Sequence, residues 1–381
     1  MQFSFSNDQI AFTNTVRTFA NNKMAPYANK WDLEKTLPVD VLKEAAALGL
    51  AAIYIDEKLG GTGLGRLDAA LIFEELSTAC PSTAAFLSIH NMAAWMISKY
   101  GTKFHHENIL KKLISMDYIA SYCLTEPGSG SDASSLSTTA IRDGDCYILN
   151  GTKSFISGAG LSDVYLTMVR TGGKGPSGIS CLIIEKESEG LSFGKLEQKM
   201  GWNSQPTAQV IFEDCKVPIK NLIGKEGDGF KIAMQGLDGG RINIASCSLG
   251  AAKVCLEKSL NYVKERSQFG KKISDFQATQ FKLADMSTQL EAAKLMVLKA
   301  AYELDNQGQN TTQSCAMAKR YATDVGFEVC NQALQLHGGY GYLSEYQIER
   351  YVRDLRVHQI LEGTNEIMRV IIAKKLLENR K

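Results

Sequence analysis

A single carboxylate near the end of the chain, Glu362, has neighbours that suit proton transfer. It lies in the stretch RDLRVHQILEGTNEIMRV, between Ile360, Leu361 and Gly363. Apolar neighbours remove water from a carboxylate, which raises its pKa and makes the ionised form a better proton acceptor. The residues alone allow two interpretations: a general base, or an ordinary carboxylate at the junction of two helices.

A loop rich in glycine and serine is the second candidate. In YCLTEPGSGSDASS, Gly128, Gly130 and Ala133 have the spacing of a dinucleotide-binding fingerprint. That interpretation fails, because the next segment predicts a hairpin and not the helix that would hold a pyrophosphate. The loop is either a surface turn or a source of backbone N–H groups and hydroxyls for a polar ring or a phosphate.

A third pattern, GLSFG at residues 190–194, matches the nucleophile elbow of hydrolases. His337 and His358 follow it in the order that a hydrolase needs. However, Ser192 would have to begin a helix, and the following GKLEQKMGWNSQPT has no apolar periodicity. The pattern therefore does not favour a hydrolase.

The remaining charged and histidine motifs give weak signals. His105 and His106 beside Glu107 lack the i, i+4 spacing of a helical metal site, so we predict a solvated helix face there and no metal site. Arg241 follows two glycines at the expected start of a long helix. It is either a helix-terminal charge or an anchor for an anionic substrate.

The composition is typical of an enzyme with two or three packed regions. Across 381 residues, 42 Lys and Arg nearly balance 41 Asp and Glu, which argues against nucleic acid and anionic membranes as partners. Nine scattered cysteines without a CxxC motif predict a reducing compartment and no structural zinc. With no signal peptide or membrane-spanning run evident, we expect a cytoplasmic protein, or a mitochondrial matrix protein if the chain is a processed eukaryotic form.

Local patterns predict helices first, then strands, then helices. Residues 6–116 carry apolar residues at helical intervals; Ser6 and Gln9 have a capping-box spacing, and Pro38 suits the first turn of a helix. From Tyr118, β-prone runs such as DVYLTMVR and GISCLIIE alternate with turn signals, and Asp143-Gly144 and Asn150-Gly151 predict hairpin turns.

From Gly229, three long helical segments and a shorter helix after Glu362 predict a bundle, with a capping-box spacing at Ser274 and Gln277. We therefore expect an α+β, mostly α, fold. Its domains are an N-terminal α-helical domain (1–117), a middle antiparallel, β-barrel-like domain (118–226) and a C-terminal four-helix bundle (227–381). This order excludes a doubly wound sheet, in which strands and helices alternate throughout.

Six stretches together resemble the acyl-CoA dehydrogenase family. In chain order they are YCLTEPGSGSD, NGTKSFISGAG, GGRINIASCSLG, ERSQFGKKISDFQATQF, QLHGGYGY and YVRDLRVHQILEGTNEI, and the resemblance covers essentially the whole chain. GWNSQP and GLDGGRINIASCSLGAA are most similar to the branch that acts on isobutyryl-CoA. The resemblance implies α,β-dehydrogenation of a short, 2-methyl-branched acyl-CoA, with butyryl-CoA and 2-methylbutyryl-CoA as alternative substrates.

The same resemblance implies binding residues for FAD and acyl-CoA. Along the flavin and its pyrophosphate it implies Tyr122, Leu124, Thr125, Ser131, Phe155 and Ser157, with Thr364 and Glu366 closing over the cofactor. At the adenine half of an FAD in a neighbouring subunit it implies Arg266, Gln268, Phe269, Gln277, Gln335 and Gly339. At the substrate it implies Ser131, Asp238, Arg241 and Gly363. This sharing implies a homotetramer, a dimer of dimers, and the family's electron acceptor is an electron-transferring flavoprotein.

The resemblance also implies a role for Glu362. A hydrogen alpha to a thioester is weakly acidic, so a base must remove it while donors hold the carbonyl oxygen and hydride leaves the beta carbon for flavin N5. Glu362 is implied as that base. Some relatives carry the base just before the arginine of GGR, but here that position is Gly240. Two positions depart from the family: Phe155 stands where many members have Trp, and Ser157 replaces Thr but keeps the hydroxyl.

Other functions remain as alternatives. An acyl-CoA oxidase would return electrons to oxygen and would usually carry an additional C-terminal region. A nitroalkane-oxidase-like enzyme would have Asp in place of Glu362. A non-catalytic acyl-CoA-binding protein would not need that carboxylate, and a thioester hydrolase would need no flavin.

Overall fold

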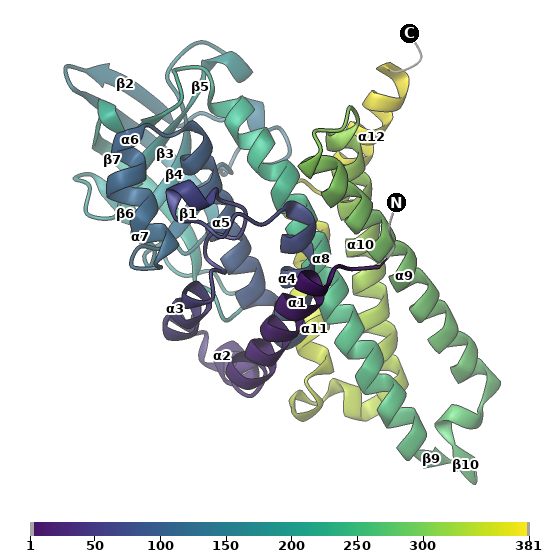
Figure 1. The fold of residues 1–381 in the computed structure, drawn as a ribbon. Helices are drawn as coiled ribbons and strands as arrows, with labels where there is room; N and C mark the ends of the chain where they lie inside the picture. Colours follow the sequence, from purple (N-terminus) through teal and green to yellow (C-terminus); the bar gives the residue numbers. More distant parts are fainter. Residues whose placement is uncertain (1–3, 379–381) are drawn as a thin grey trace.

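The computed structural model describes residues 4–378, in which helices, a sheet and a helical bundle follow one another along the chain (Figure 1). The N-terminal helices are α1 (Asn7–Phe19), α2 (Ala28–Glu34), α3 (Val39–Ala47), α4 (Arg66–Ala79), α5 (Pro81–Tyr100), α6 (Lys103–His105) and α7 (Lys111–Ile114). Ser6 caps α1 in a capping box with Gln9, as predicted. Pro38 is the residue just before α3 and not a member of its first turn.

One prediction in this region is wrong. His105 is buried, and its Nδ1 accepts a hydrogen bond from the Thr102 backbone N–H at 2.9 Å, so it does not belong to a solvated helix face. Its Nδ1 thus caps the short helix, while its Nε2 is buried without a hydrogen-bond partner among the described residues. His106 is half-buried, with Nε2 at 3.1 Å from the Ser98 carbonyl.

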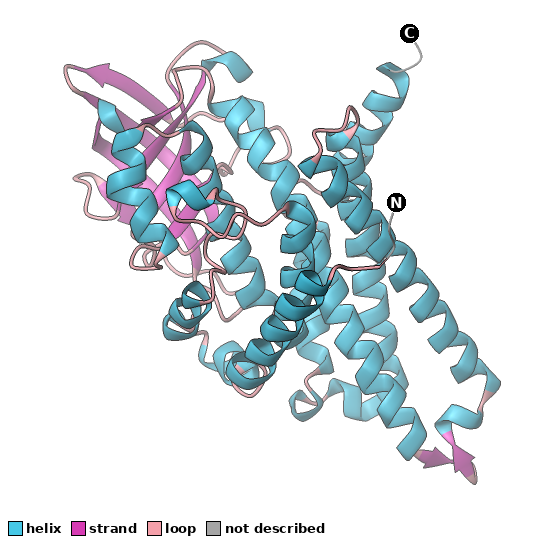
Figure 2. Ribbon diagram, viewed as in Figure 1, coloured by secondary structure: helices cyan, strands magenta, loops and turns pink. Residues whose placement is uncertain are grey.

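The middle region is one eight-stranded sheet, drawn in magenta in Figure 2. Its strands are β1 (Ala120–Cys123), β2 (Thr139–Asp143), β3 (Cys146–Ser157), β4 (Val164–Arg170), β5 (Ile179–Glu185), β6 (Leu191–Phe193), β7 (Thr207–Pro218) and β8 (Leu222–Ile223). They lie in the order β6-β7-β3-β2-β4-β5-β8, with β1 on β4. The sheet is mainly antiparallel as expected, but β4 pairs in parallel with both β1 and β2.

The two predicted hairpin turns have different outcomes. Asp143-Gly144 joins the antiparallel strands β2 and β3, as expected. Asn150-Gly151 lies inside β3, where the pairing with β7 shifts register and Gly151 has a φ of +144°. A bulge absorbs the conformation that would otherwise turn the chain, so β3 continues through the dipeptide.

The C-terminal region is the predicted bundle, made of α8 (Gly229–Glu265), α9 (Gln277–Asp305), α10 (Thr311–His337), α11 (Ile348–Arg356) and α12 (Asn365–Glu378). A small ladder of β9 (Ser267–Gln268) and β10 (Lys271–Lys272) lies at its far end, away from the main sheet (Figure 2). Residue Phe276 precedes α9, so the predicted capping box at Ser274 and Gln277 is wrong. Ser274 belongs instead to a 3₁₀ turn, Ile273–Asp275.

Helix α8 has 37 residues and spans about 55 Å. The helix continues without a break through Gly239 and Gly240. Arg241 therefore lies in its interior and is not a helix-terminal charge. Figure 1 shows α8 passing from the side of the sheet into the bundle, and it contacts α4, α5, α9 and α10. Helix α8 thus contacts both the N-terminal helices and the helices of the bundle.

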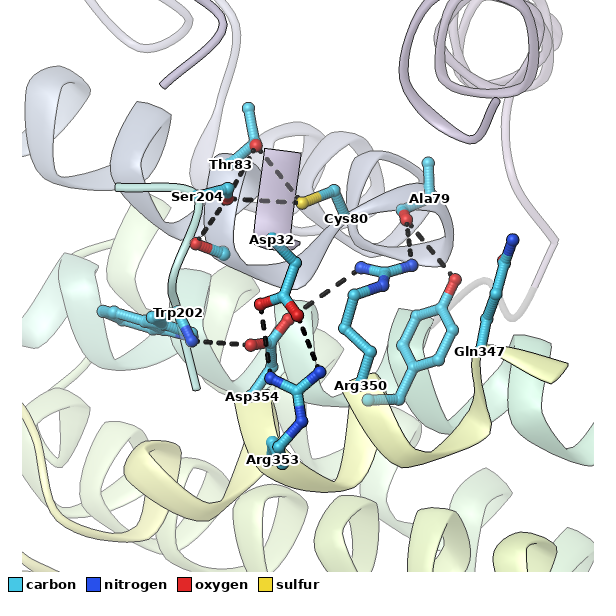
Figure 3. Close-up of polar contacts among 12 residues, drawn as sticks. Asp32, Ala79, Cys80, Thr83, Trp202, Ser204, Gln347, Arg350, Arg353 and Asp354 are labelled. Carbon is cyan, nitrogen blue, oxygen red and sulfur yellow. Dashed lines mark hydrogen bonds and ion pairs between the residues drawn. The ribbon is translucent and has the colours of Figure 1, made fainter. Parts of the chain in front are cut away.

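A buried polar cluster joins the three regions where α11 approaches the N-terminal helices (Figure 3). Arg353 Nη2 on α11 lies 2.7 Å from Asp32 Oδ2 on α2. Asp354 accepts a hydrogen bond from the Trp202 backbone N–H at 2.6 Å, and Arg350 donates to the Ala79 carbonyl at 3.1 Å. The cluster anchors α11, which leads directly to Glu362.

The described residues 4–378 include no helix long and apolar enough to cross a membrane. Within the same range, no group of His, Cys, Asp and Glu side chains could hold a metal ion. All nine cysteines are free thiols, and eight are buried.

Candidate active site

Glu362 lies in a short loop between a 3₁₀ turn, Val357–Gln359, and α12. Its φ is +54° and that of Gly363 is +90°. For a residue with a side chain the left-handed conformation costs roughly 1–2 kcal/mol, so surrounding contacts must maintain it. His358 supplies one anchor: its ring accepts from Trp202 Nε1 at 3.2 Å and lies 2.8 Å from Ser248 Oγ.

The carboxylate of Glu362 points at α8, where Gly240 leaves room for it. A Cβ placed on Gly240 would lie 2.5 Å from Oε2. Oε2 is buried and has no hydrogen-bond partner among the described residues. Burial raises the pKa of Glu362 to about 7, with Lys319 and Arg241 lowering it in part. The raised pKa predicted from the sequence is confirmed, and at neutral pH the group is poised to accept or return a proton.

Two cations hold the backbone of this loop. Arg241 Nε donates to the Glu362 carbonyl at 3.3 Å, and its Nη1 pairs with Asp238 at 2.8 Å. Lys319 on α10 donates to the Gly363 carbonyl at 2.9 Å. Arg241 was predicted as a site residue and Lys319 was not, although Lys319 occupies an apolar-face position of its helix, in step with Cys315 and Ala322.

Further unpaired polar atoms surround the carboxylate. Arg66 stacks on Tyr54 with Cζ 3.5 Å from the ring centroid, and a side chain on Gly239 would collide with its Nη1. Adjacent glycines of α8 therefore face Arg66 and Glu362. Buried atoms without a partner here are Arg66 Nη1, Tyr122 Oη, Asn243 Oδ1 and Glu362 Oε2. Such atoms are rare in folded proteins, and their gathering in one place is typical of a ligand site.

A second group of predicted residues meets at the far end of the bundle. Arg266, Gln268, Gln335 and Gly339 line a pocket of about 380 Å³ there. Phe269 beside it is 93% exposed, with a φ of +53°. Lys319 and His337 are about 27 Å apart along α10, so this pocket is remote from Glu362 within one chain.

Comparison with known families agrees with this arrangement. Residues 6–117 match the acyl-CoA dehydrogenase N-terminal domain, 121–215 the middle domain and 227–377 the C-terminal domain. The chain belongs to the acyl-CoA dehydrogenase family. It is therefore an oxidoreductase of the kind that acts on CH–CH bonds, and its family consists of flavoproteins.

Individual acyl-CoA dehydrogenases match almost the full chain. "Isobutyryl-CoA dehydrogenase, mitochondrial" of Dictyostelium discoideum is 57% identical over 97% of this chain and 89% of its own length. The butyryl-CoA dehydrogenase structure from Megasphaera elsdenii is 39% identical, with a TM-score of 0.96 over 99% of this chain and 100% of that chain. A chain in the structure titled for the electron transferring flavoprotein of Acidaminococcus fermentans is 41% identical, with a TM-score of 0.96 and the same coverage.

The residues implied along an acyl-CoA dehydrogenase flavin lie at the ends of β1 and β3. Ser121, next to Tyr122, donates to the Ser157 carbonyl at 2.6 Å, and the Ser154 N–H donates to the Thr125 carbonyl at 2.8 Å. Leu124 is buried, and Phe155 is 68% exposed with a φ of +59°. Ser131 is exposed in the loop that follows. Their roles remain predictions.

The remaining predicted residues of the dehydrogenase are divided between the two sites. Thr364 Oγ1 accepts from the Ile367 N–H at 3.3 Å and so caps α12, while Glu366 is exposed in its first turn. Asp238 is linked to the Glu362 backbone by Arg241, which contacts both. The Asp238 carboxylate also accepts a hydrogen bond from the Thr312 hydroxyl at 2.8 Å. Gln277 is exposed at the start of α9. Tyr54 and Arg66 belong to no motif that the sequence offered, and Asn243 lies in GGRINIASCSLG but was not predicted as a site residue.

Proposed function

We propose that this enzyme removes one hydrogen each from the alpha and beta carbons of a short, 2-methyl-branched acyl-CoA, with isobutyryl-CoA as the preferred substrate. The support is the gap in identity: 57% to an isobutyryl-CoA dehydrogenase against 39% to a butyryl-CoA dehydrogenase. Butyryl-CoA and 2-methylbutyryl-CoA are the competing substrates.

The observation that carries the reaction is the unpaired carboxylate of Glu362 facing the side-chain gap at Gly240. In its ionised form Oε2 takes the alpha proton of the thioester. With a pKa of about 7, the protonated product of this step is also stable in the buried site. Arg241 and Lys319 hold the backbone, which leaves both carboxylate oxygens free to receive the proton.

The residues present fit FAD as the cofactor. Tyr122 on β1 has a buried hydroxyl without a partner, and Phe155 on β3 offers an exposed ring. At Gly128, Gly130 and Gly339 an added Cβ would meet nothing within 4 Å, so the backbone is open to a phosphate or a ring. When bound, FAD supplies the acceptor for the hydride that leaves the beta carbon.

The FAD site is completed, in our proposal, by a neighbouring subunit. Arg266, Gln268, Phe269, Gln277, Gln335 and Gly339 lie at or near the far pocket, which one chain cannot bring to its own Glu362. A second copy, placed with its far end against the flavin region of the first, would supply these residues. A homotetramer built as a dimer of dimers satisfies every copy in this way.

We further propose an electron-transferring flavoprotein as the electron acceptor. The fold match to a chain in a structure titled for such a protein supports this partner. An acyl-CoA oxidase would instead form hydrogen peroxide rapidly in air.

A panel of acyl-CoA substrates with an artificial electron acceptor tests the substrate. The purified protein should be yellow, and kcat/KM should be highest for isobutyryl-CoA, ahead of butyryl-CoA and 2-methylbutyryl-CoA. Preference for octanoyl-CoA, or a colourless protein that does not take up FAD, would contradict the proposal.

A further inference from the structure

The ammonium group of Lys319 is buried beneath the loop that carries Glu362. Lys319 is 0% exposed on α10, and Nζ donates to the Gly363 carbonyl at 2.9 Å and to Asn365 Oδ1 at 3.0 Å. Removing an ammonium group from water is costly unless acceptors or an opposite charge compensate for it. Apolar packing therefore does not explain why a lysine occupies this buried position.

The contact of Lys319 acts on a strained backbone. The consecutive carbonyls of Glu362 and Gly363 accept hydrogen bonds from two helices, from Arg241 on α8 and from Lys319 on α10. Both loop residues have positive φ values, +54° and +90°. Two helices thus hold the one conformation that turns the Glu362 side chain toward Gly240.

Neither cation pairs with the carboxylate itself. Among the described residues, no ion pair within 4.0 Å involves Glu362, and Oε2 has no partner. The positive charge of Lys319 therefore favours the ionised carboxylate without occupying the oxygen that would receive a proton. The charge of Arg241 also favours the ionised Glu362 carboxylate, but Lys319 lowers the pKa of Glu362 more.

We propose that Lys319 is a positioning residue of the catalytic site: it holds the Glu362 loop so that the carboxylate faces Gly240, and its charge favours the ionised base. This rests on the proposed role of Glu362 as that base. The contacts of Lys319 with Gly363 and Asn365 carry the inference.

Few groups near Glu362 can change charge between about pH 6 and 9. The titratable and charged groups around it and around Lys319 are Tyr54 before α4, Arg66 on α4, Tyr122 on β1, Asp238, Arg241 and Cys247 on α8, Cys315 and Asp324 on α10, His358 before the loop, and Glu366 on α12. Burial raises the pKa of the tyrosines and of the cysteines, so they stay neutral. Burial lowers the pKa of His358 to about 3, so it also stays neutral. Burial lowers the pKa of Lys319 to about 8, so both it and Glu362 are charged between about pH 7 and 8.

The test is the pH profile of flavin reduction in the FAD-loaded enzyme, followed by anaerobic stopped flow with isobutyryl-CoA. Lys319→Met should move the midpoint upward by about 1 pH unit and lower the plateau rate by about 10²-fold. Lys319→Arg, which keeps the charge and the donors, should return the midpoint toward that of the parent. Lys253→Met on α8 is the control, because Lys253 is a partly buried lysine that pairs with Glu75 at 2.9 Å and not with the Glu362 loop.

A second readout does not depend on activity. The folded-state pKa of Glu362, about 7, exceeds its ordinary 4.5, so its contribution to stability is complete below pH 4.5 and is lost as pH rises through 7. In Lys319→Met the pKa of Glu362 should be higher, so the melting temperature should continue to fall to a higher pH than in the parent. In the double variant with Glu362→Gln, that extension should vanish.

The outcomes separate this inference from the proposed function. If Glu362→Gln stops flavin reduction while Lys319→Met keeps the parent midpoint and plateau, the role of Lys319 is wrong and the base assignment stands. If Glu362→Gln reduces flavin at the parent rate, the proposed function itself fails. A Lys319→Met variant that only melts earlier shows a structural role and also overturns the inference. If this variant does not fold, Lys319→Gln, which keeps a donor but no charge, undergoes the same pH test.

Discussion

At the scale of single residues, Glu362 differs from Glu126 because its buried Oε2 has no hydrogen-bond partner among the described residues. Glu126 is also buried, but Lys153 pairs with it at 2.7 Å, and its pKa falls to about 2. Glu362 has no such partner, and its pKa rises to about 7. Burial alone therefore does not set the direction of a carboxylate pKa, because a close ion pair lowers the pKa of Glu126 and Glu362 has no such pair.

Glu362→Gln should nearly abolish flavin reduction. The amide keeps the size and one acceptor oxygen but cannot take a proton, so the rate should fall by roughly 10² to 10⁴ or more. FAD content and acyl-CoA binding should remain close to those of the parent. Stopped-flow measurement of the flavin absorbance separates this step from product release. A parent-like rate would mean that Glu362 is only a residue at a helix junction.

At the scale of elements, α8 and the loop before α12 converge on one point. Gly240 on the helix and Glu362 on the loop compete for the same space, since a Cβ at Gly240 would lie 2.5 Å from Oε2. The α11 cluster shown in Figure 3 fixes the direction from which the loop arrives. The catalytic geometry is thus a property of two elements that meet, and neither determines it alone.

Moving the carboxylate from the loop to the helix should retain part of the activity. In Gly240→Glu with Glu362→Gly, the space left by Glu362 receives the new side chain, and its carboxylate can face the same alpha carbon. Gly240→Glu alone should be inactive, because its Cβ collides with the existing carboxylate. Flavin reduction rates of both variants, compared with Glu362→Gly alone, check this. No gain of the double variant over Glu362→Gly would contradict it.

Arg350→Met should destabilise the junction of the three regions. Arg350 is 1% exposed and lies 3.9 Å from the buried Asp354, whose pKa burial raises to about 6. Without the arginine, that carboxyl loses its compensating charge, and the free energy of unfolding should fall by about 3 kcal/mol. The control is Arg356→Met, an exposed arginine on the same helix, which should change stability by less than about 0.5 kcal/mol. Urea unfolding of both variants at pH 7 measures the difference.

At the scale of the whole molecule, the predicted flavin residues lie at two ends of an elongated chain. Figure 1 shows the sheet at one side and the β9–β10 ladder at the far end of the bundle. The exposed ring of Phe269 lies in that ladder's turn. Our proposed assembly brings this end of one copy to the flavin region of another.

Mixing two inactive variants should restore activity if subunits share the FAD site. Arg266→Ser should lower FAD retention, whereas Lys264→Ser, its exposed neighbour, should not. Hybrids of Arg266→Ser and Glu362→Gln chains would contain sites with an intact Glu362 from one chain and an intact Arg266 from the other. Refolding the mixture and measuring dehydrogenase activity and mass by light scattering tests this. Hybrids without activity, or a monomeric parent, would contradict the shared site.

Local patterns determined much of this protein from the sequence alone. The capping box at Ser6 and the turn at Asp143-Gly144 depend on residues a few positions apart, so local chemistry specifies them. The linked motifs likewise indicated the family and pointed to Glu362. A pattern of this kind needs no knowledge of distant neighbours.

Tertiary structure decided the features that depend on residues far apart in the sequence. His105 is buried, Asn150-Gly151 forms a bulge and not a turn, and Arg241 lies inside a helix, because packing and strand pairing override local preference at each. Lys319 looks like an ordinary helical lysine until the fold places it against Gly363. The free carboxylate of Glu362 is also a tertiary result, since its charge state depends on the cations that the bundle places near its backbone and away from its oxygens.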